Sequence, residues 1–187
     1  YARSKAPLLI ENRQLQYLIT ADLRAFGLGY SKVSRNKKNL ISSGVIYKGL
    51  NRYESLDTLN SPAVNQARQQ AYFGSVLHFM RALAAKDLFG RGYRIMYQGK
   101  IIDPEDMISV VPQKGTDKIV VRVADIVEIL YRGKELSVME VVSNTFFIDG
   151  QGNHSPIDKV RFGGVMGDQR MGDALPNDYL LQPVSKN

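Results

Sequence analysis

The chain has no cysteine and no tryptophan, and only two histidines among its 187 residues. Without cysteine, the sequence excludes disulfide bonds, thiolate-zinc sites and cysteine nucleophiles. No apolar run approaches the roughly 18 residues of a membrane-spanning helix, so no such helix is predicted. The length suffices to bury a core without covalent cross-links. We therefore predict a single domain over residues 1–187.

The common enzyme signatures are missing as well. There is neither an HExxH zinc motif nor a GxSxG nucleophile elbow. Gly44 and Gly49 have the spacing of a phosphate loop, but Leu50 and Asn51 follow instead of Lys and Ser or Thr. Asp149–Asn153 is superficially similar to a calcium loop, but the ligand pattern fails and a hairpin turn is favoured. We therefore predict no catalytic residue, no metal and no cofactor.

Positive charge is concentrated in the first third of the chain. The net charge is +7, and residues 1–60 hold ten Lys or Arg against four Asp or Glu. Two interpretations stay open: a solvated loop between strands, or a contact with phosphate, lipid headgroups or an acidic partner. The candidate binding residues are Lys32, Arg35, Lys37, Lys38 and Tyr47.

The first sixty residues predict strands. Pro7–Asn12 is expected to be a short edge strand, and Tyr17–Phe26 alternates as a half-buried strand does. Gly27–Gly29 is expected to end that strand. Leu40–Lys48 has strand composition and should pair with Tyr17–Phe26 as an antiparallel hairpin with a long loop.

One long helix is predicted next. Ser61 suits an N-cap, Pro62 suits the first helical position, and the pattern runs to about Phe89. Its apolar residues cover more than one face, which predicts burial by the rest of the fold. Gly74 lies in the middle, where the helix either kinks with Ser75 as a new cap or meets another backbone closely. We prefer the close approach.

The rest of the chain predicts a meander of short antiparallel strands. The expected fold class is therefore α+β, with antiparallel meander sheets packed around one long helix. This helix is either straight or kinked. The predicted strands are Tyr93–Gln98, Met107–Val111, Lys118–Val123, Val127–Arg132, Val138–Ile148 and Lys159–Phe162.

The two histidines are interpreted as structural. His78 lies on the predicted helix beside Leu77 and Phe79, which favours a hydrogen-bonded core histidine over a catalytic base. His154 falls in a predicted turn and is expected to be exposed.

The helix also supports a resemblance. Tyr72–Leu83, which reads YFGSVLHFMRAL, resembles the Y-x-G-S-L-x-H-F-L-R-A-L signature of carboxypeptidase-like regulatory-domain-containing proteins of Bacteroidetes-type bacteria. Further segments resemble the family in the same order, so that the similarity covers about residues 8–183. These segments are Leu9–Phe26, Val45–Gly49, Ile129–Glu135, Asp149–Asn153 and Leu175–Tyr179.

Two positions depart from the family's pattern. Gln16 stands where a glycine is usual, and Val165–Gly167 replaces an aromatic-rich G-Y-W-G. The segment Gly133–Met139 is also shorter than expected. The structural residues of the signature in this chain are Tyr72, Gly74, Ser75, His78, Phe79 and Arg81.

The resemblance implies a bacterial cell-envelope protein, in the periplasm or at the outer membrane, with a regulatory-like β-sandwich upstream. We expect a non-enzymatic accessory or protein-binding domain whose partner is another envelope protein or an anionic polymer, with nucleic acid not favoured. Two alternatives stay open. One is a glycan- or peptide-acting hydrolase with carboxylates that converge from separate strands, and the other is an anionic-polymer binder acting through the basic first third.

Overall fold

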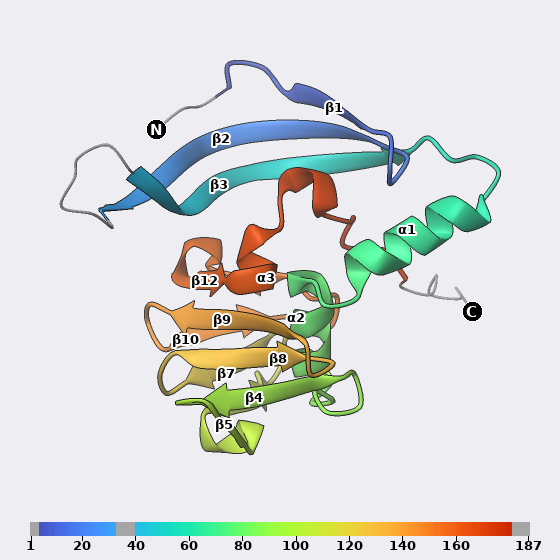
Figure 1. Ribbon diagram of the computed structural model, residues 1–187. Helices are drawn as coiled ribbons and strands as arrows, with labels where there is room; N and C mark the ends of the chain where they lie inside the picture. Colours follow the sequence, from blue (N-terminus) through green and yellow to red (C-terminus); the bar gives the residue numbers. More distant parts are fainter. Residues whose placement is uncertain (1–3, 33–39, 181–187) are drawn as a thin grey trace. The chain divides into compact units, whose positions relative to one another are not determined.

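The computed structural model describes residues 4–32 and 40–180, and the side chains of these residues outside 25–48. In this part of the chain, twelve strands form three antiparallel sheets, with three short α-helices (Figure 1). The chain forms two compact units, Tyr1–Gln69 and Gln70–Asn187. The expectation of one domain over residues 1–187 stays a prediction.

The first unit is a three-stranded sheet in the order β1-β2-β3, formed by β1 (Leu8–Asn12), β2 (Tyr17–Lys32) and β3 (Leu40–Ser55). The predicted edge strand is confirmed, and β2 and β3 form the predicted antiparallel hairpin. The predicted partners are wrong, because residues 17–23 pair with residues 49–55, and Leu40–Lys48 pairs with residues 25–32. The predicted break at Gly27–Gly29 is wrong, because β2 continues through these residues to Lys32 in register with β3. Two bulges keep the long pair aligned.

The buried face of this unit follows the alternation that the sequence predicts. Tyr17, Ile19 and Ala21 are buried, together with Leu15 in the turn that precedes them. Arg68 covers this face: its Nε donates to the Leu15 carbonyl at 2.9 Å, and its guanidinium carbon lies 4.0 Å from the centre of the Tyr17 ring. A buried arginine thus finds carbonyl oxygen and an aromatic face as partners.

Gly49 fixes the first bulge. A Cβ at this position would lie 2.3 Å from the carbonyl oxygen of Asp22, which no real side chain tolerates. The chain needs glycine here because β2 and β3 approach too closely for any other residue. Beyond this point the pairing with β1 has ended, since Leu8 pairs with Ala21.

The single long helix is not present, which corrects the predicted fold class. The segment divides into α1 (Pro62–Tyr72) and α2 (Val76–Ala84), and the third helix, α3 (Gly164–Asp168), is shorter still. The fold is mostly β-sheet and does not pack around one helix. Only α2 has the expected burial, because most residues of α1 are exposed or half-buried.

The second unit holds two antiparallel sheets that share one core with α2. One sheet has the order β12-β9-β8-β4-β5 and the other the order β11-β10-β7-β6. Successive hairpins alternate between the sheets, so strands distant in sequence become neighbours. The bounds are β4 (Tyr93–Tyr97), β5 (Lys100–Ile102), β6 (Ile108–Pro112), β7 (Ile119–Val123), β8 (Val127–Tyr131), β9 (Glu135–Val141), β10 (Thr145–Ile148), β11 (His154–Ser155) and β12 (Val160–Gly163).

The core of this unit lies among α2, α3 and the inner faces of both sheets. Phe79, Ile95, Ile129 and Phe146 come from four different elements and are each 0% exposed. Five of the six strand predictions are confirmed within a residue. The sixth, Val138–Ile148, is two strands, β9 and β10, separated by a turn. The short strands β5 and β11 were not predicted.

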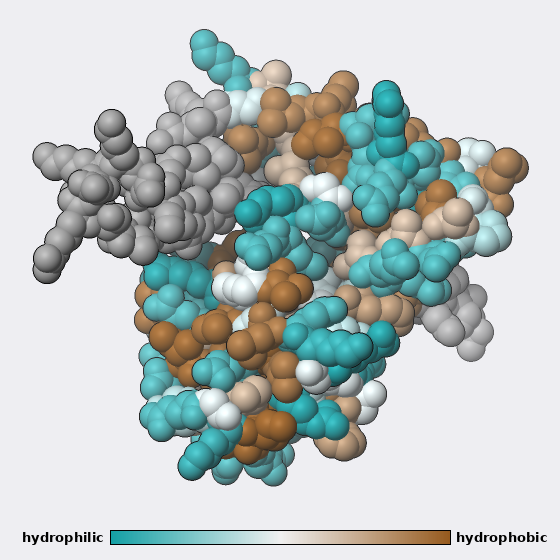
Figure 2. Space-filling model, in the orientation of Figure 1, coloured by the Kyte–Doolittle hydropathy of each residue, from teal (hydrophilic) through white to brown (hydrophobic). Residues whose placement is uncertain are grey.

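Apolar side chains also lie on the outer face of the five-stranded sheet. Leu136 on β9 is 47% exposed and Ile101 on β5 is 62% exposed. Figure 2 shows brown, apolar residues over this sheet, interrupted by teal, polar ones. The charged residues Glu128 and Glu140 lie at outward positions on the same strands, so the apolar surface is not continuous.

Candidate functional site

The candidate site forms around the break between α1 and α2. Gly74 has a φ of +83°, in the left-handed region that glycine tolerates best. Ser75 then caps α2, because its hydroxyl accepts a hydrogen bond from the His78 backbone N–H at 3.1 Å. The alternative of a break capped by Ser75 is therefore confirmed.

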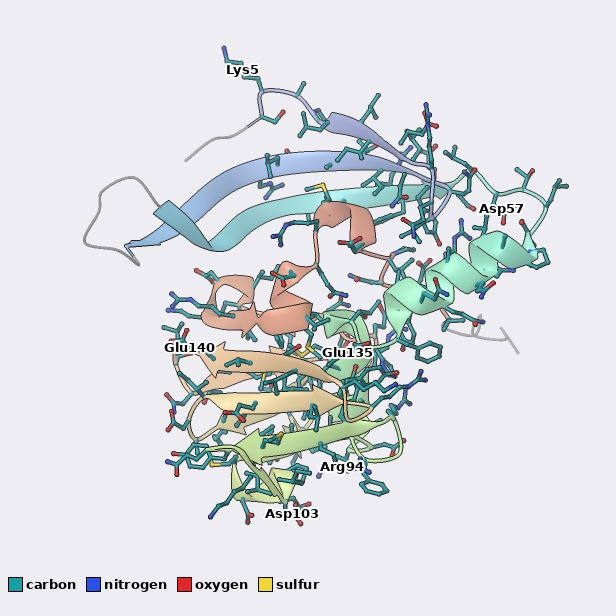
Figure 3. The ribbon with its side chains drawn as sticks, viewed as in Figure 1. Lys5, Asp57, Arg94, Asp103, Glu135 and Glu140 are labelled. Carbon is teal, nitrogen blue, oxygen red and sulfur yellow. The ribbon has the colours of Figure 1, made fainter. Side chains whose placement is uncertain are left out.

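The close packing that was predicted at Gly74 is also partly present. A Cβ on this residue would lie 2.8 Å from Oε2 of Glu135 and 3.0 Å from the Tyr131 ring. Glu135, labelled in Figure 3, is the first residue of β9. The neighbour that approaches is a pair of side chains, however, and not the second backbone that the sequence analysis preferred.

His78 is held inside this break. It is 3% exposed, and its Nδ1 lies 3.2 Å from the Gly74 backbone nitrogen and 2.9 Å from the Tyr93 hydroxyl. Because the backbone N–H can only donate, Nδ1 must be the acceptor, and the Tyr93 hydroxyl therefore donates to it as well. The hydrogen of the neutral ring is then on Nε2.

Charge and burial both keep this imidazole neutral. Burial is the largest cause that lowers the pKa of His78 from 6.5 to about 4, and the positive charges of Arg91, Arg132 and Arg81 act in the same direction. A ring with its Nδ1 occupied and so low a pKa is not poised to act as a general base. The structural interpretation of His78 is the one the geometry supports.

Aromatic rings surround the imidazole. The ring centres of Tyr72, Phe73, Tyr93 and Tyr131 lie between 4.9 and 5.8 Å from that of His78. Burial raises the pKa of the Tyr93 and Tyr131 hydroxyls. The Tyr131 hydroxyl is buried and has no hydrogen-bond partner among the residues that the structure describes. These hydroxyls stay protonated at neutral pH.

Arg81 joins α2 to two distant loops. Its Nε donates to the Gln151 carbonyl at 2.8 Å, and its Nη1 and Nη2 donate to the carbonyls of Tyr179 and Asn177, each at 2.7 Å. Its Nη1 also donates to the Tyr72 hydroxyl at 3.3 Å. With a residue exposure of 6%, this guanidinium is buried among carbonyl oxygens and stabilises the segment 177–179 against the helix.

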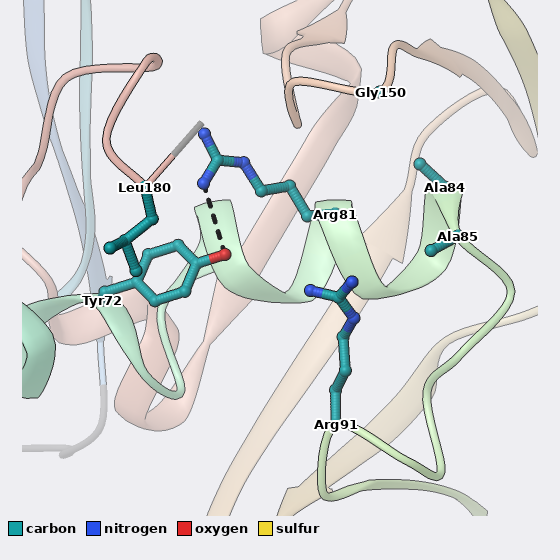
Figure 4. Close-up of a pocket in the computed structure, with 7 residues that line it drawn as sticks. All are labelled: Tyr72, Arg81, Ala84, Ala85, Arg91, Gly150 and Leu180. Carbon is teal, nitrogen blue, oxygen red and sulfur yellow. Dashed lines mark hydrogen bonds between the residues drawn. The ribbon is translucent and has the colours of Figure 1, made fainter. Parts of the chain in front are cut away.

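A pocket of about 300 Å³ lies beside this arginine. Figure 4 shows Arg81 reaching across it from α2 to Tyr72, with Arg91 entering from the opposite side. The lining residues are Tyr72, Arg81, Ala84, Ala85, Arg91, Gly150 and Leu180.

The predicted residues divide between the two units. The residues of the helix signature converge, since Tyr72, Gly74, Ser75, His78 and Arg81 all take part in the contacts described above, and Phe79 is in the core. The candidate binding residues are in the first unit: Lys32 ends β2, and Tyr47 in β3 is opposite Phe26. Arg35, Lys37 and Lys38 lie outside the described residues.

Three contributors were missed by the sequence analysis. Arg91, Tyr93 and Tyr131 lie 8, 10 and 48 residues beyond the end of the signature at Leu83, so no helical spacing connects them to it. The inward positions of Tyr93 and Tyr131 on their strands were the only signal, and that signal is the same for any core residue. The expectation for His154 was wrong, because this residue is half-buried in β11 and burial lowers its pKa.

The Asp149–Asn153 segment is a turn, as predicted. Oδ1 of Asp149 accepts from the backbone N–H groups of Gln151 and Asn153, at 2.9 and 3.0 Å. The carboxylate therefore orders its own loop. Across residues 4–32 and 40–180, no group of three His, Asp or Glu side chains could hold a metal ion, and no helix is long and apolar enough to cross a membrane.

No family model matches the chain, and neither a curated protein nor a solved structure matches it.

Proposed function

We propose that this chain is a non-enzymatic interaction domain of the bacterial cell envelope, and that it binds another envelope protein along the outer edge of β3. The observation that carries the proposal is the pairing of β3. This strand has sixteen residues and is the last strand of its sheet, so among the described strands it is hydrogen-bonded only to β2. An edge of this length offers backbone donors and acceptors to an added strand.

The hydrogen bonds of the sheet identify the groups on that edge. The Leu56 backbone N–H donates to the Gln16 carbonyl at 2.9 Å, which directs position 56 toward the β2 side. Backbone groups alternate along a strand, so positions 54, 52 and 50 also face β2. The N–H groups of Asn51 and Ser55 therefore face away from β2.

Charged side chains beside this edge make indiscriminate pairing unfavourable. Arg52 and Glu54 are exposed on β3 and form an ion pair with each other. Charges on an edge strand discourage association with strands that do not match them. A partner strand must therefore supply polar or oppositely charged groups opposite these two residues, which supports a specific protein partner.

The buried state of His78 supports a binding role over hydrolysis. One form of the hydrolase hypothesis requires a cleft in which a carboxylate lies beside His78. His78 is instead 3% exposed, and its Nδ1 already accepts hydrogen bonds. The envelope location rests on the resemblance of Tyr72–Leu83. Fractionation of the native bacterium tests it: we expect the protein in the envelope fraction, and its recovery in the cytosol would contradict this location.

The β3 edge is tested by photo-cross-linking in the native bacterium. Leu50, which is 64% exposed, is replaced by p-benzoylphenylalanine, and the adducts are identified by mass spectrometry. We expect one dominant envelope protein. A second change, Asn51→Pro, removes an outward N–H without removing a bond to β2 and should abolish the adduct. Asn51→Ala keeps the N–H and should retain it.

Two results would overturn the β3 proposal. One is the absence of any adduct at Leu50. The other is an adduct of equal yield in the Asn51→Pro and Asn51→Ala variants, provided that circular dichroism shows both to be folded.

A further inference from the structure

The pocket beside Arg81 contains two guanidinium groups and a tyrosine hydroxyl, and no carboxylate lines it. All seven lining residues belong to the unit Gln70–Asn187, and none is on the β3 edge. A ligand of this pocket would therefore bind at a place separate from the β3 edge, and its chemistry can be inferred independently of the proposed function.

We propose that this pocket binds a carboxylate group that is attached to a small apolar body. Such a group occurs in a small organic acid and at the C-terminus of a peptide chain. The polar side of the pocket recognises the carboxylate, and the apolar side selects what it is attached to.

Arg91 supplies the first set of donors. Its side chain is 39% exposed, and its ion pair within the described residues joins Nε to Oδ2 of Asp87 at 3.7 Å, which is longer than a hydrogen bond. The terminal nitrogens are therefore available to a ligand, and Figure 4 shows this side chain directed toward α2, near the point where Arg81 leaves the helix. A planar guanidinium matches the two oxygens of a carboxylate better than any other side chain does.

Tyr72 supplies the second donor. Its hydroxyl oxygen accepts from Nη1 of Arg81 at 3.3 Å, which fixes the position of the oxygen and leaves its hydrogen for another acceptor. The residue is 5% exposed, so the hydroxyl is held in place before any ligand arrives. Donors that are fixed in advance bind an anion without a large loss of side-chain entropy.

The electrostatic balance of the pocket is positive. Arg81 is buried and donates to three backbone carbonyls and to the Tyr72 hydroxyl, and Arg91 lines the same pocket. The last turn of α2, which ends at Ala84, opposes them with the partial negative charge of its carbonyls. The Asp87 carboxylate, 3.7 Å from Nε of Arg91, offsets part of the charge of that arginine, and a helix end carries about half an elementary charge. Arg81 donates to backbone carbonyls and not to a carboxylate among the described residues, so its full charge keeps the pocket positive.

The remaining lining sets the size and character of the ligand. Ala84, Ala85, Leu180 and the ring of Tyr72 offer carbon surface beside the donors. A volume of about 300 Å³ is at the lower end of the range for small-molecule sites. A single ring or a short branched chain fits these limits.

The test is a calorimetric and NMR titration of the whole chain at constant ionic strength. Benzoate is compared with benzamide, which has the same shape and no charge. N-acetyl-leucine and its amide form a second pair, which represents a peptide C-terminus, and inorganic phosphate tests an anion without an apolar body. We expect each acid to bind about tenfold or more tightly than its amide, since one charge-assisted contact is worth at least that factor.

Two variants locate the binding. Arg91→Gln should weaken benzoate binding about tenfold, and Tyr72→Phe should weaken it severalfold while keeping the ring. Arg122→Gln, which removes an exposed arginine on β7, is the matched control and should leave binding unchanged. Whether benzoate or N-acetyl-leucine binds more tightly identifies the source of the carboxylate.

Three results would overturn the proposal: no binding of either acid, equal binding of acids and amides, or equal loss in Arg91→Gln and Arg122→Gln. Since none of these changes touches β3, they would leave the cross-linking result at Leu50 unaffected.

Discussion

At the scale of single residues, the second unit contains two buried tyrosines with opposite hydrogen-bonding states. The Tyr93 hydroxyl lies 2.9 Å from Nδ1 of His78, whereas the Tyr131 hydroxyl has no hydrogen-bond partner within residues 4–32 and 40–180. Their ring centres are only 4.8 Å apart, so the two sites share one environment. A phenylalanine at each position removes only the hydroxyl.

We therefore expect Tyr93→Phe and Tyr131→Phe to differ in stability. Tyr93→Phe should lower the free energy of unfolding by about 1–2 kcal/mol, because the buried acceptor on His78 loses a donor. Tyr131→Phe should change it by less than about 0.5 kcal/mol or raise it, because an unpaired buried hydroxyl disappears. Urea denaturation at equal m-value measures both, and equal losses would contradict the assignment of partners.

His78 makes stability depend on pH in a defined window. The folded-state pKa is about 4 and the ordinary value is 6.5, so between these values the unfolded chain binds the extra proton. The contribution of His78 is fully present above pH 6.5 and is lost as the pH falls toward 4, by at most about 3 kcal/mol.

The comparison with His78→Asn isolates this contribution. The amide oxygen can accept a hydrogen bond near the position of Nδ1, and the side chain does not titrate. Stability is measured by urea denaturation at several pH values, and we expect a steeper decline in the original chain between pH 6.5 and 4. Parallel curves would show that His78 does not titrate abnormally.

The backbone conformation of Gln16 explains why the family pattern has a glycine at this position. Its φ is +51°, a conformation that glycine adopts without strain and other residues adopt less readily. Its carbonyl accepts from the Leu56 backbone N–H and from Nη2 of Arg68, so the turn is held by the residue after β3 and by α1. The family pattern has glycine at this position, and the positive φ explains why glycine suits it. The sequence alone does not reveal this φ.

At the scale of elements, the break between α1 and α2 organises the candidate site. It allows Ser75 to cap α2 and places the Gly74 N–H against His78. Helical periodicity continues through the break, because α1 and α2 are both amphipathic. A pattern of apolar residues therefore could not separate one helix from two.

Gly74→Ala tests whether the break needs glycine for its space as well as its φ. We expect a loss of about 2–3 kcal/mol, because the new methyl group would meet the buried Tyr131 ring in addition to adopting a left-handed φ. Gly115→Ala is the control, with a φ of +77° and no atom within 4 Å, and should lose only about 1 kcal/mol. Equal losses by urea denaturation would mean that contact with Tyr131 does not matter.

The strands show which parts of an element the sequence can predict. The alternation from Tyr17 to Ala21 predicted the buried face correctly, because a sheet buries every second residue. The extension of β2 through Gly27 and Gly29 was missed, since glycine suggests a break by propensity while pairing with β3 holds these residues extended. Cross-strand hydrogen bonds decided the length of the strand.

At the scale of the whole molecule, positive charge is concentrated in residues 1–60. This imbalance is set by the sequence and does not depend on how the two units are arranged. The ten basic residues in positions 1–60 and the open edge of β3 belong to the same unit. An anionic polymer would meet this unit first, since long-range attraction follows charge density.

Retention on heparin tests this expectation. We compare a variant with Lys32, Arg35, Lys37 and Lys38 changed to Gln with a control in which Lys100, Lys114, Arg122 and Lys134 are changed to Gln. Both lose four positive charges. We expect the first variant to elute at clearly lower salt than the control, because clustered charges release more counterions on binding. Elution of both at the same salt would show that only net charge matters.

The sequence by itself determined several local features of this protein: the inward face of β2, the turn at Asp149 and the basic first third. Each of these depends on neighbours within a few positions. The tertiary structure alone decided that Tyr93, Tyr131 and Arg91 meet the segment from Tyr72 to Arg81, and that carbonyls from residues 151, 177 and 179 surround Arg81. These contacts join residues 10 to 98 positions apart, and their geometry depends on how two sheets and a helix fill one core, which periodicity does not encode.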